Sequence, residues 1–556
     1  MTNREVAKML DHIADILQFK DDNSFKIKAY RQAANSIYHL DEDIQCLYEK
    51  GRLDDIPGVG KAIKAKIEEL IEKGSCEYYE KLLGEVPPGL LGMLAIPGVG
   101  HKTIKAVFER LGVTNREELL QAAREQKIRL LPGMGNKTED SIIKGIEMLK
   151  LHNHKNTLGF VYPMAEELLA YLRGDEKVVD ASLAGSIRRG RSLVSDIDIV
   201  VAAEEEDMVR AKVVNYRAVK QIISSARGYI EGILQFDVPF EIIIVPPEEY
   251  CPALFWATGS KQHLAKLIPG LERDSTRGCK SEKEIYERFT LDYIPPELRE
   301  DQGEIEAAAT ASLPELIELD DLEGDLHTHS SWSDGTSKIP ELAEAARKMS
   351  YSYLAITDHS RSLVISGGLN EERLKAQGQE IDLLNQQWDD FILFKGTEVD
   401  ILKDGSLDFG SEVLAALDIV VASIHSHFHL DQEKQTERII QAIKDNNVDI
   451  IGHLTGRLLN RRPPYELDFD RILDEAAKNK IILEINSHPD RLDIDADLAR
   501  QAHEHGIKVA INSDAHHKND LKLTQYGVLN ARKGWLQKED IINTWTRDAI
   551  IAYIKE

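Results

Sequence analysis

The chain has 556 residues, of which 42% are hydrophobic and 29% charged, and 95 acidic side chains outnumber 69 basic ones. Ordinary apolar content with aromatic residues throughout excludes a disordered or low-complexity chain, and the length predicts three or four domains of about 100–200 residues each. The longest apolar runs have only the length of a strand, and the N-terminus lacks an apolar signal segment. We therefore expect a protein that is neither exported nor embedded in a membrane.

Net charge differs between segments of the chain. Residues 1–150 carry 23 basic and 24 acidic side chains, whereas residues 151–320 carry 19 and 30, and residues 321–556 carry 27 and 41. The acidity that would repel a nucleic acid therefore lies outside the first segment. Twelve of the 18 histidines lie in residues 321–556, and imidazole together with carboxylate indicates a metal site there. The four cysteines lie far apart without a C-x-x-C pair, which is typical of core thiols in a reducing cytoplasm.

The first 150 residues are predicted to be helical throughout, with short amphipathic helices such as 4–17 and 25–38 between glycine turns. A Pro-Gly-x-Gly turn followed by an amphipathic helix occurs three times, at 56–60, 96–100 and 131–135. This is the helix-hairpin-helix signature, in which glycines allow close approach and the helix N-terminus offers free N–H groups to a phosphate. One copy could be an ordinary turn, but three copies predict sequence-independent binding to a DNA backbone. The candidate glycines are Gly58, Gly60, Gly98, Gly100, Gly133 and Gly135.

From residue 151 the pattern changes to strands alternating with helices, including strands expected at 195–201 and 240–245. Asp196 and Asp198 stand two residues apart at the head of the first strand and point to one face, an arrangement that can hold two divalent ions for in-line phosphoryl transfer. The preceding run Gly185-Ser186-Ile187-Arg188-Arg189-Gly190 adds a hydroxyl and two guanidinium groups suited to a triphosphate. A capped strand beside a solvated arginine pair is the alternative interpretation.

Residues 293–312 are polar, contain prolines and are expected to form a linker with one helix. From residue 324 onward, six predicted strands alternate with amphipathic helices, and each strand opens into a polar loop. This pattern indicates a parallel barrel of the TIM type, whose functional groups lie at the carboxyl ends of the strands. The strands are expected at 353–357, 391–396, 419–423, 449–453, 481–486 and 508–512, and the helices at 338–348, 370–387, 434–445, 469–478 and 496–504.

Side chains that can ligate metal stand at the ends of successive predicted strands, and these ends converge in a barrel. Nine N/O ligands are too many for one ion, because a catalytic zinc typically takes about three protein ligands. Two or three ions are therefore expected, and imidazole with carboxylate but without thiolate suits Zn²⁺, Mn²⁺ or Fe²⁺. The nine candidates are His327, His329, Asp334, His359, Glu398, His425, His453, Asp514 and His516.

Other polar residues of this segment are interpreted differently. Arg457 and Arg491 are expected either to bind a phosphate or to pair with a neighbouring acid. Five histidines that lack motif support are interpreted as surface residues, namely His427, His429, His503, His505 and His517.

Residues 185–201 resemble the nucleotidyltransferase palm of the family X DNA polymerases, which carries G-S-x-R-R-G followed by D-x-D. The resemblance implies that Asp196 and Asp198 bind Mg²⁺ or Mn²⁺ for template-directed addition of dNMP in short gaps. Residues 23–31 resemble the small N-terminal DNA-binding domain of the family. Lys66, a further DNA-binding candidate, aligns with the lysine that forms a Schiff base with an abasic sugar in some members, and an ordinary exposed helix lysine is the alternative. The implied nucleotide-binding residues are Ser186, Arg188, Arg189 and Gly259, the last in a T-G-S turn.

The sequence departs from the family pattern later in the palm. The third catalytic carboxylate of the family is an Asp on the neighbouring strand, where this chain has Glu241, with Asp237 as an off-register alternative. The extra methylene of Glu241 moves its carboxylate by more than about 1 Å, and a misplacement of that size can cost about 10²-fold in rate. Ser195 replaces the usual glycine before D-x-D, Ile243 replaces the usual arginine, and the asparagine expected after Ser260 is absent. Two hypotheses follow: a working polymerase, or a lapsed palm that serves as a DNA-binding scaffold.

The motifs that contain the nine metal-ligand candidates resemble, in order, the H-x-H, S-D-G, T-D-H, E, H, G-H and D-x-H elements of the PHP (polymerase and histidinol phosphatase) domain. The resemblance implies a trinuclear site that hydrolyses phosphoesters. A small-molecule phosphatase with an appended binding module is a third hypothesis, which the three hairpin turns disfavour.

The order of these segments is similar to that of bacterial family X DNA polymerases with a C-terminal PHP domain, over nearly the whole chain. The resemblance implies a cytoplasmic, monomeric DNA-repair enzyme with 3′→5′ exonuclease activity that acts on gapped or primer-template DNA and dNTPs. The expected fold class is multidomain α+β and α/β. The expected domains are an N-terminal lyase-like helical domain (1–83), helix-hairpin-helix fingers (84–150), a palm with a mixed sheet (151–245), a shortened thumb (246–300), a linker (301–323) and a distorted TIM-like barrel (324–556).

Overall fold

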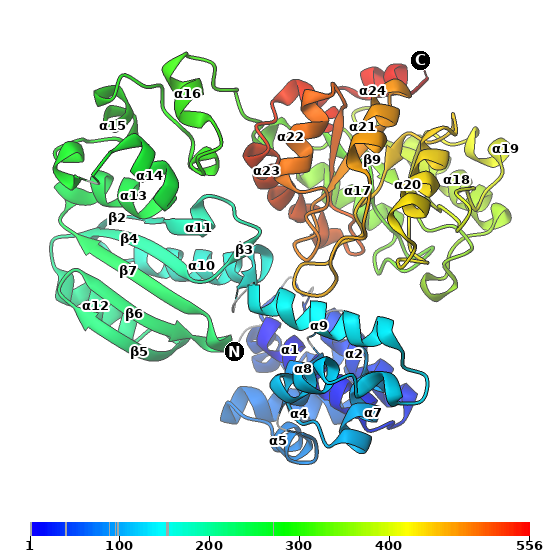
Figure 1. Cartoon of the computed structure of the whole chain (residues 1–556), viewed down its shortest axis with the longest axis horizontal. Coiled ribbons are helices and arrows are strands. Elements are labelled where there is room, and N and C mark those ends of the chain that lie inside the picture. Colours follow the sequence, from blue (N-terminus) through cyan, green and yellow to red (C-terminus); the bar gives the residue numbers. More distant parts are fainter. Residues whose placement is uncertain are drawn as a thin grey trace. The chain divides into compact units, whose positions relative to one another are not determined.

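The computed structural model describes residues 3–555 except 39, 41, 88, 95, 97, 98, 152–154 and 271. Contacts divide it into two compact units (Figure 1): Met1–Asn153 with Asn460–Pro463, and His154–Leu459 with Pro464–Glu556. Among the described helices, none is long and apolar enough to cross a membrane.

The first unit is helical, as the amphipathic patterns predict. The expected helices 4–17 and 25–38 correspond to α1 and α2, and those that follow the three Pro-Gly turns correspond to α4, α7 and α9. Apolar residues at helical spacing, such as Leu10 and Ile13 of α1, form one shared core. The helices are α1 (Asn3–Phe19), α2 (Ser24–Tyr38), α3 (Ile44–Glu49), α4 (Lys61–Lys73), α5 (Glu77–Gly84), α6 (Leu90–Leu94), α7 (His101–Leu111), α8 (Arg116–Arg124) and α9 (Asn136–Leu151).

The second unit begins with a five-stranded mixed sheet in the order β2-β4-β7-β6-β5. The central strands β4 and β7 run parallel, and the other neighbours are antiparallel. Strand β4 is an almost continuous apolar run because both of its faces are covered, whereas the edge strand β5 is mostly exposed. The strands are β2 (Val178–Leu183), β4 (Ile197–Ala203), β5 (Val219–Ala226), β6 (Tyr229–Leu234) and β7 (Pro239–Val245), and helices α10 (Leu158–Arg173) and α12 (Glu206–Val214) share their core.

The segment after the sheet forms a small helical subdomain, and it includes part of the expected linker. Ile294, Leu298 and Ala308 are buried in the same core as the preceding helices. The polar residues of this segment indicated an exposed linker, but some of them are buried because groups within the protein meet their hydrogen-bonding capacity. Buried Glu304, for example, accepts hydrogen bonds from the backbone of Asp301 and Gln302. The helices are α13 (Tyr250–Thr258), α14 (Lys261–Leu267), α15 (Glu282–Arg288) and α16 (Glu304–Ala309).

The remaining residues form a nearly closed parallel barrel of seven strands in sequential order. The first and last strands approach each other through a parallel bridge between Thr328 and Ala515 and a hydrogen bond from Ser513 N to Asp325 Oδ2 at 3.0 Å. All six expected strands are present, and β8 is additional because two residues are too few for a periodic pattern. The strands are β8 (Gly324–Asp325), β9 (Tyr353–Ile356), β10 (Ile392–Asp400), β11 (Ile419–Ser423), β12 (Ile450–Ile451), β13 (Ile482–Asn486) and β14 (Val509–Asn512).

Helices follow the barrel strands close to the five expected positions, as α17 (Ile339–Lys348), α18 (Glu371–Asn385), α20 (Gln432–Ile443), α21 (Phe469–Lys478) and α22 (Ala496–Glu504), and α23 (Thr524–Lys533) is an additional helix that was not expected. Helix α23 also contacts the mixed-sheet region. Tyr526 lies in one apolar cluster with Leu158 and Val161 of α10, and its ring centroid is 6.0 Å from that of Tyr162. The sheet and the barrel therefore share part of their core.

Candidate functional site

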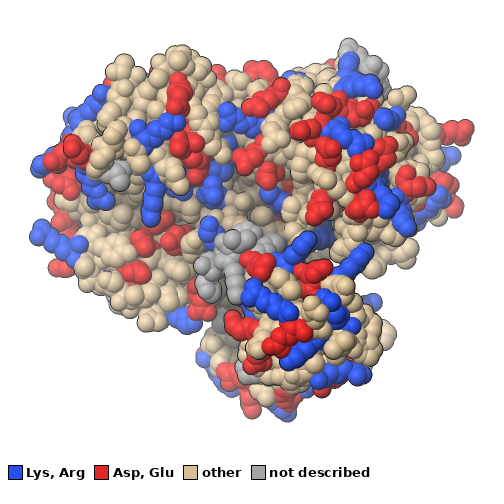
Figure 2. Space-filling model, viewed as in Figure 1, with Lys and Arg blue, Asp and Glu red and all other residues tan. Residues whose placement is uncertain are grey.

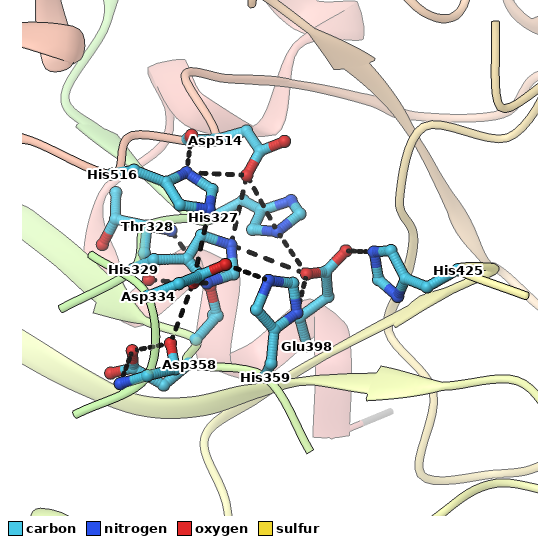
Figure 3. Close-up of polar contacts among 12 residues, drawn as sticks. His327, Thr328, His329, Asp334, Asp358, His359, Glu398, His425, Asp514 and His516 are labelled. Atoms are coloured by element: carbon cyan, nitrogen blue, oxygen red, sulfur yellow. Dashed lines mark hydrogen bonds and ion pairs between the residues drawn. The ribbon is translucent and has the colours of Figure 1, made fainter. Parts of the chain in front are cut away.

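The barrel brings all nine metal-ligand candidates together at the carboxyl ends of its strands, and Figure 3 shows eight of them. Each side chain follows, or lies near the end of, a strand, except Asp334, which lies in the loop after β8. Eight of the nine lie within 4.8 Å of other candidates, measured between ligand atoms, in three groups. These groups are His329, Asp334, His359 and His516; His327, His329 and Asp514; and His359, Glu398 and His425.

Glu398 is the centre of this arrangement and is 1% exposed. Its Oε2 lies 2.7 Å from His359 Nδ1 and 3.5 Å from His327 Nε2 and His329 Nε2. Its Oε1 lies 3.0 Å from His453 Nε2 and 3.2 Å from His425 Nε2. The ninth candidate, His453, thus joins the cluster through Glu398, and one carboxylate faces five imidazoles.

Several of these buried atoms have no hydrogen-bond partner among the described residues. They include His327 Nε2, both ring nitrogens of His329, both carboxylate oxygens of Glu398 and His453 Nδ1. A buried polar atom without a partner costs about 1–3 kcal/mol, so this many in one place fits a site built for cations. Imidazole and carboxylate without thiolate suit Zn²⁺, Mn²⁺ or Fe²⁺, and three overlapping groups have room for two or three ions.

The charges of the centre depend on its protonation. Burial disfavours the imidazolium form, but the carboxylates of Glu398 and Asp334 raise the pKa of His359 to about 10. Burial together with His516 and His359 lowers the pKa of His329 to about 3. A metal ion must displace the extra proton of an imidazole with a raised pKa such as His359, so metal affinity falls as the solution becomes more acidic.

Buried carboxylates beneath the nine candidates were missed by the sequence analysis. Asp400 Oδ1 lies 2.7 Å from His425 Nδ1, and Glu484 Oε1 lies 2.7 Å from His327 Nδ1. Asp358 accepts from Ser330 N at 2.9 Å, as well as from the Ser330 hydroxyl. Asp358 and Asp400 stand inside the recognised motifs, and an acid within an otherwise apolar strand was the available signal for Glu484.

The structure distinguishes Arg457 from Arg491, each of which was expected either to bind a phosphate or to pair with an acid. Arg457 pairs with Asp495 at 2.9 Å and donates to the carbonyl groups of Arg491 and Leu492, so it holds a loop. Arg491 lies 4.0 Å from the Asp514 carboxylate, and its Nη1 is buried without a hydrogen-bond partner among the described residues. Arg491 is therefore the better candidate for a phosphate ligand.

The mixed sheet places three carboxylates side by side. Asp198 of β4 stands opposite Glu241 of β7 in the parallel register, and Asp196 precedes β4 by one residue. Burial, then Asp196 and Glu241, raise the pKa of Asp198 to about 7. The off-register alternative, Asp237, is exposed and pairs with Lys220 at 2.6 Å. The register thus supports Glu241 as the third carboxylate of this group.

Gly185 is needed beside Asp198 because an added Cβ would lie 1.7 Å from Asp198 Oδ2. Gly185→Ala is therefore expected to displace that carboxylate and to lower primer extension by about 10²-fold, the cost of an ångström-scale misplacement. Extension of a labelled primer on a gapped duplex measures this. Gly190→Ala is the matched control, because its φ of +63° is similar to the +57° of Gly185 but its nearest atom, Leu529 Cβ, is 3.4 Å away. Equal losses in both variants would contradict the steric explanation.

The high pKa of Asp198 predicts a pH dependence. A pKa of about 7 leaves Asp198 mostly protonated at pH 6 and ionised at pH 8, and only the ionised form binds a divalent ion well. The Mg²⁺ concentration that gives half-maximal primer extension is therefore expected to rise about tenfold for each pH unit below 7. Titrations at pH 6, 7 and 8 measure it, and a value that is constant across this range would contradict the prediction.

The nucleotide-binding candidates surround Thr258. Arg188 donates to the Thr258 hydroxyl at 2.7 Å and pairs with Glu282, while Arg189 donates to the Thr258 carbonyl at 2.7 Å and pairs with Glu300 at 3.0 Å. A side chain at Gly259 would meet Leu264 at 2.8 Å, so the T-G-S turn packs tightly against α14. Ser186 lies in the one-turn helix α11 (Gly185–Arg188) beside these arginines. Both guanidinium groups are thus present but already bound to carboxylates.

The three helix-hairpin-helix turns have a common geometry. Each closes with a backbone bond of 3.0–3.1 Å, from Val59 to Ile56, from Val99 to Ile96 and from Met134 to Leu131. Gly58 and Gly133 have left-handed φ values of +82° and +76°. Gly60 and Gly100 precede the first residues of α4 and α7, and Gly135 occupies the same place before α9, whereas Gly98 lies outside the described residues. On the face drawn in Figure 2, basic and acidic side chains alternate over this unit.

Lys66 of α4 is half-buried rather than fully exposed. Its Nζ donates to Ala62 O at 2.9 Å and lies 4.5 Å from the centre of the Tyr78 ring. Burial lowers its pKa below the usual value. These features suit a reactive amine and an anchored helix lysine alike.

Comparison with known proteins follows the same division. Residues 1–76 match the helix-hairpin-helix domain, residues 90–148 the SAM-like helix-hairpin-helix tandem and residues 325–488 the PHP domain. The DNA polymerase/3′-5′ exonuclease PolX of Bacillus subtilis (strain 168) is 36% identical over 572 aligned positions that cover 100% of both chains. The chain belongs to the PolX family.

Similarity to two probable phosphatases covers less of the chain. A probable phosphatase of Thermoanaerobacter sp. (strain X514) is 31% identical over 42% of this chain and 94% of its own length. A probable phosphatase of Caldanaerobacter subterraneus is 30% identical over 42% of this chain and 91% of its own length. The PolX relative, in contrast, matches the chain from end to end. Membership of the PolX family and the fold class implied by the sequence are thus confirmed.

Proposed function

We propose that this PolX protein is a cytoplasmic DNA-repair enzyme that joins a polymerase palm to a metal-dependent 3′→5′ exonuclease in the barrel. The convergence of nine N/O side chains, with Glu398 at their centre, carries this proposal, because such a donor set binds several divalent ions. The end-to-end similarity to the Bacillus PolX protein supports the pairing of the two activities. The four free cysteines are consistent with a reducing compartment, although Cys46 is exposed rather than a core thiol.

In the barrel, the nine candidates would hold two or three Zn²⁺, Mn²⁺ or Fe²⁺ ions. Ions bound there supply Lewis acidity toward a phosphodiester and activate water at neutral pH. Arg491 would donate to a phosphate oxygen through its unpaired Nη1. The hairpin turns and Lys66 would hold the DNA backbone independently of sequence. The substrate would be gapped or primer-template DNA, and the protein would act as a monomer.

In the palm, Asp196, Asp198 and Glu241 would hold Mg²⁺ or Mn²⁺ between the primer terminus and a dNTP. The triphosphate would lie against Ser186, Arg188, Arg189 and Gly259. Because Arg189 is paired with Glu300, a triphosphate must compete with this carboxylate for the guanidinium. Glu241 would position the primer 3′-hydroxyl from the strand next to Asp198.

The second candidate function is a nuclease on a lapsed palm. The paired arginines and the longer side chain of Glu241 motivate it, since both oppose a tight nucleotide site, whereas the end-to-end similarity to the Bacillus PolX protein disfavours it. It predicts DNA binding and hydrolysis without incorporation of dNMP.

One experiment separates these functions. Purified protein is incubated with an end-labelled, one-nucleotide-gapped duplex, four dNTPs and Mn²⁺, beside the Asp196→Ala and His327→Ala variants. Primer lengthening that is lost only in Asp196→Ala, with shortening lost only in His327→Ala, is the result expected for two active sites. Shortening without any lengthening would support the lapsed palm, and hydrolysis of a phosphomonoester with no effect on DNA would overturn both functions.

A further inference from the structure

Two fully or nearly buried carboxylates lie directly beneath histidines of different ligand groups in the barrel. Glu484 is 0% exposed and Asp400 is 5% exposed. Glu484 contacts His327, which belongs to the group with His329 and Asp514. Asp400 contacts His425, which belongs to the group with His359 and Glu398. The two carboxylates thus contact histidines of two different ligand groups.

We propose that Glu484 and Asp400 are positioning residues, each of which fixes the tautomer and orientation of one metal-ligating histidine and so governs the affinity for a different ion. This inference rests on the proposed metal centre and adds a role for side chains that do not themselves face the ions. Neither residue belongs to the nine candidate ligands.

The hydrogen-bond geometry sets the tautomer. A carboxylate only accepts hydrogen bonds, so a ring nitrogen 2.7 Å away must carry the proton. His327 and His425 therefore carry a proton at Nδ1, which leaves Nε2 as the ring nitrogen that can offer a lone pair to an ion. His327 Nε2 lies 3.5 Å from Glu398 Oε2, and His425 Nε2 lies 3.2 Å from Glu398 Oε1.

Glu484 contacts other residues of the metal centre in addition to the His327 ring. Its Oε2 accepts from His453 N at 2.7 Å, and its Oε1 accepts from Asn512 Nδ2 at 2.9 Å. Asn486 Nδ2 bridges Glu484 Oε2 at 3.3 Å and Asp514 Oδ2 at 2.9 Å. One carboxylate thus fixes His327 directly and Asp514 through Asn486.

Replacement of either carboxylate by its amide has a defined chemical consequence. At Glu484 every neighbour donates, namely His327 Nδ1, His453 N, Asn512 Nδ2 and Asn486 Nδ2. A glutamine must place its NH₂ against some of these donors. If the NH₂ faces His327, the ring must accept at Nδ1, carry its proton on Nε2 and lose its lone pair toward the ion. Such outer contacts to ligating histidines are typically worth about 10- to 100-fold in metal affinity.

The test measures Zn²⁺ binding by equilibrium dialysis and elemental analysis of the full-length protein. Asp198→Asn is present throughout, to weaken ion binding at the palm. Glu484→Gln and Asp400→Asn are each expected to weaken one Zn²⁺ by about 10- to 100-fold, and the double variant is expected to weaken two. Glu304→Gln is the matched control, because it removes a buried carboxylate 2.6 Å from His263 Nδ1 outside the centre.

The outcomes are distinguishable. Unchanged Zn²⁺ affinity in Glu484→Gln and Asp400→Asn would overturn the inference, as would a lower melting temperature without any change in affinity. If Glu484→Gln does not fold, Asp400→Asn and the shorter but charged Glu484→Asp, expected to lose less affinity than the amide, decide it. His327→Ala must itself lose Zn²⁺, and its failure to do so would reject the metal centre rather than the role of these carboxylates.

Discussion

Glu398→Gln is expected to abolish measurable shortening of a DNA strand, with a loss of at least about 10²- to 10³-fold, the usual cost of removing one electrostatic contact in an active site. The reason is its central place. Both carboxylate oxygens face imidazoles, and five ring nitrogens lie within 3.5 Å of them. An amide offers one oxygen and no negative charge, so ions held beside Glu398 would be bound less tightly.

The measurement is the rate of release of labelled 3′-terminal nucleotides, together with metal content. Glu380→Gln is a suitable control, since this glutamate in α18 of the same barrel accepts from Trp332 Nε1 and is not in a ligand group. A Glu398→Gln protein that retains its ions and more than a tenth of its hydrolysis rate would remove Glu398 from the centre.

Asp198→Asn is expected to lower primer extension by about 10³-fold or more. The substitution removes the negative charge of the carboxylate that lies between the other two, and a divalent ion needs this charge to bind there. Asp198 stands opposite Glu241 in the register of two parallel strands, and its side chain is packed against Gly185. An amide fits the same space, so binding of gapped DNA and hydrolysis in the barrel should be unchanged.

Single-turnover extension on a one-nucleotide gap measures the loss, and shortening of the same primer without dNTPs provides the internal control. Asp237→Asn, on the exposed off-register residue, should extend normally. If Asp198→Asn and Asp237→Asn extend equally well, the palm does not act through this carboxylate group.

Repetition made most of the architecture predictable from the sequence. Seven short parallel strands in one barrel bring the residue that follows each strand to the same end, so motifs far apart in sequence could be predicted to meet. The helix-hairpin-helix turns were recognisable because left-handed glycines such as Gly58 and Gly133 leave a strong local signature.

Other features depend on partners that are distant in sequence. Glu484 receives its hydrogen bonds from residues between 2 and 157 positions away, so its place in an apolar strand signals a buried acid but does not indicate which groups will contact it. The segment 301–323 looked like a linker because its polar residues gave no sign that Glu304 would be buried against His263. The pairing of Arg189 with Glu300 was hidden for the same reason.

The apolar cluster shared by α10 and α23 has a consequence for solubility. Two related phosphatases match only 42% of this chain, whereas here Tyr526 of α23 is 3% exposed and lies in one buried cluster with Leu158 and Val161 of α10. A barrel expressed alone would present this side of α23 to water and tend to aggregate. Substitutions that unfold the palm should accordingly lower the yield of active nuclease, even though the described residues of the palm contribute none of the nine ligand candidates.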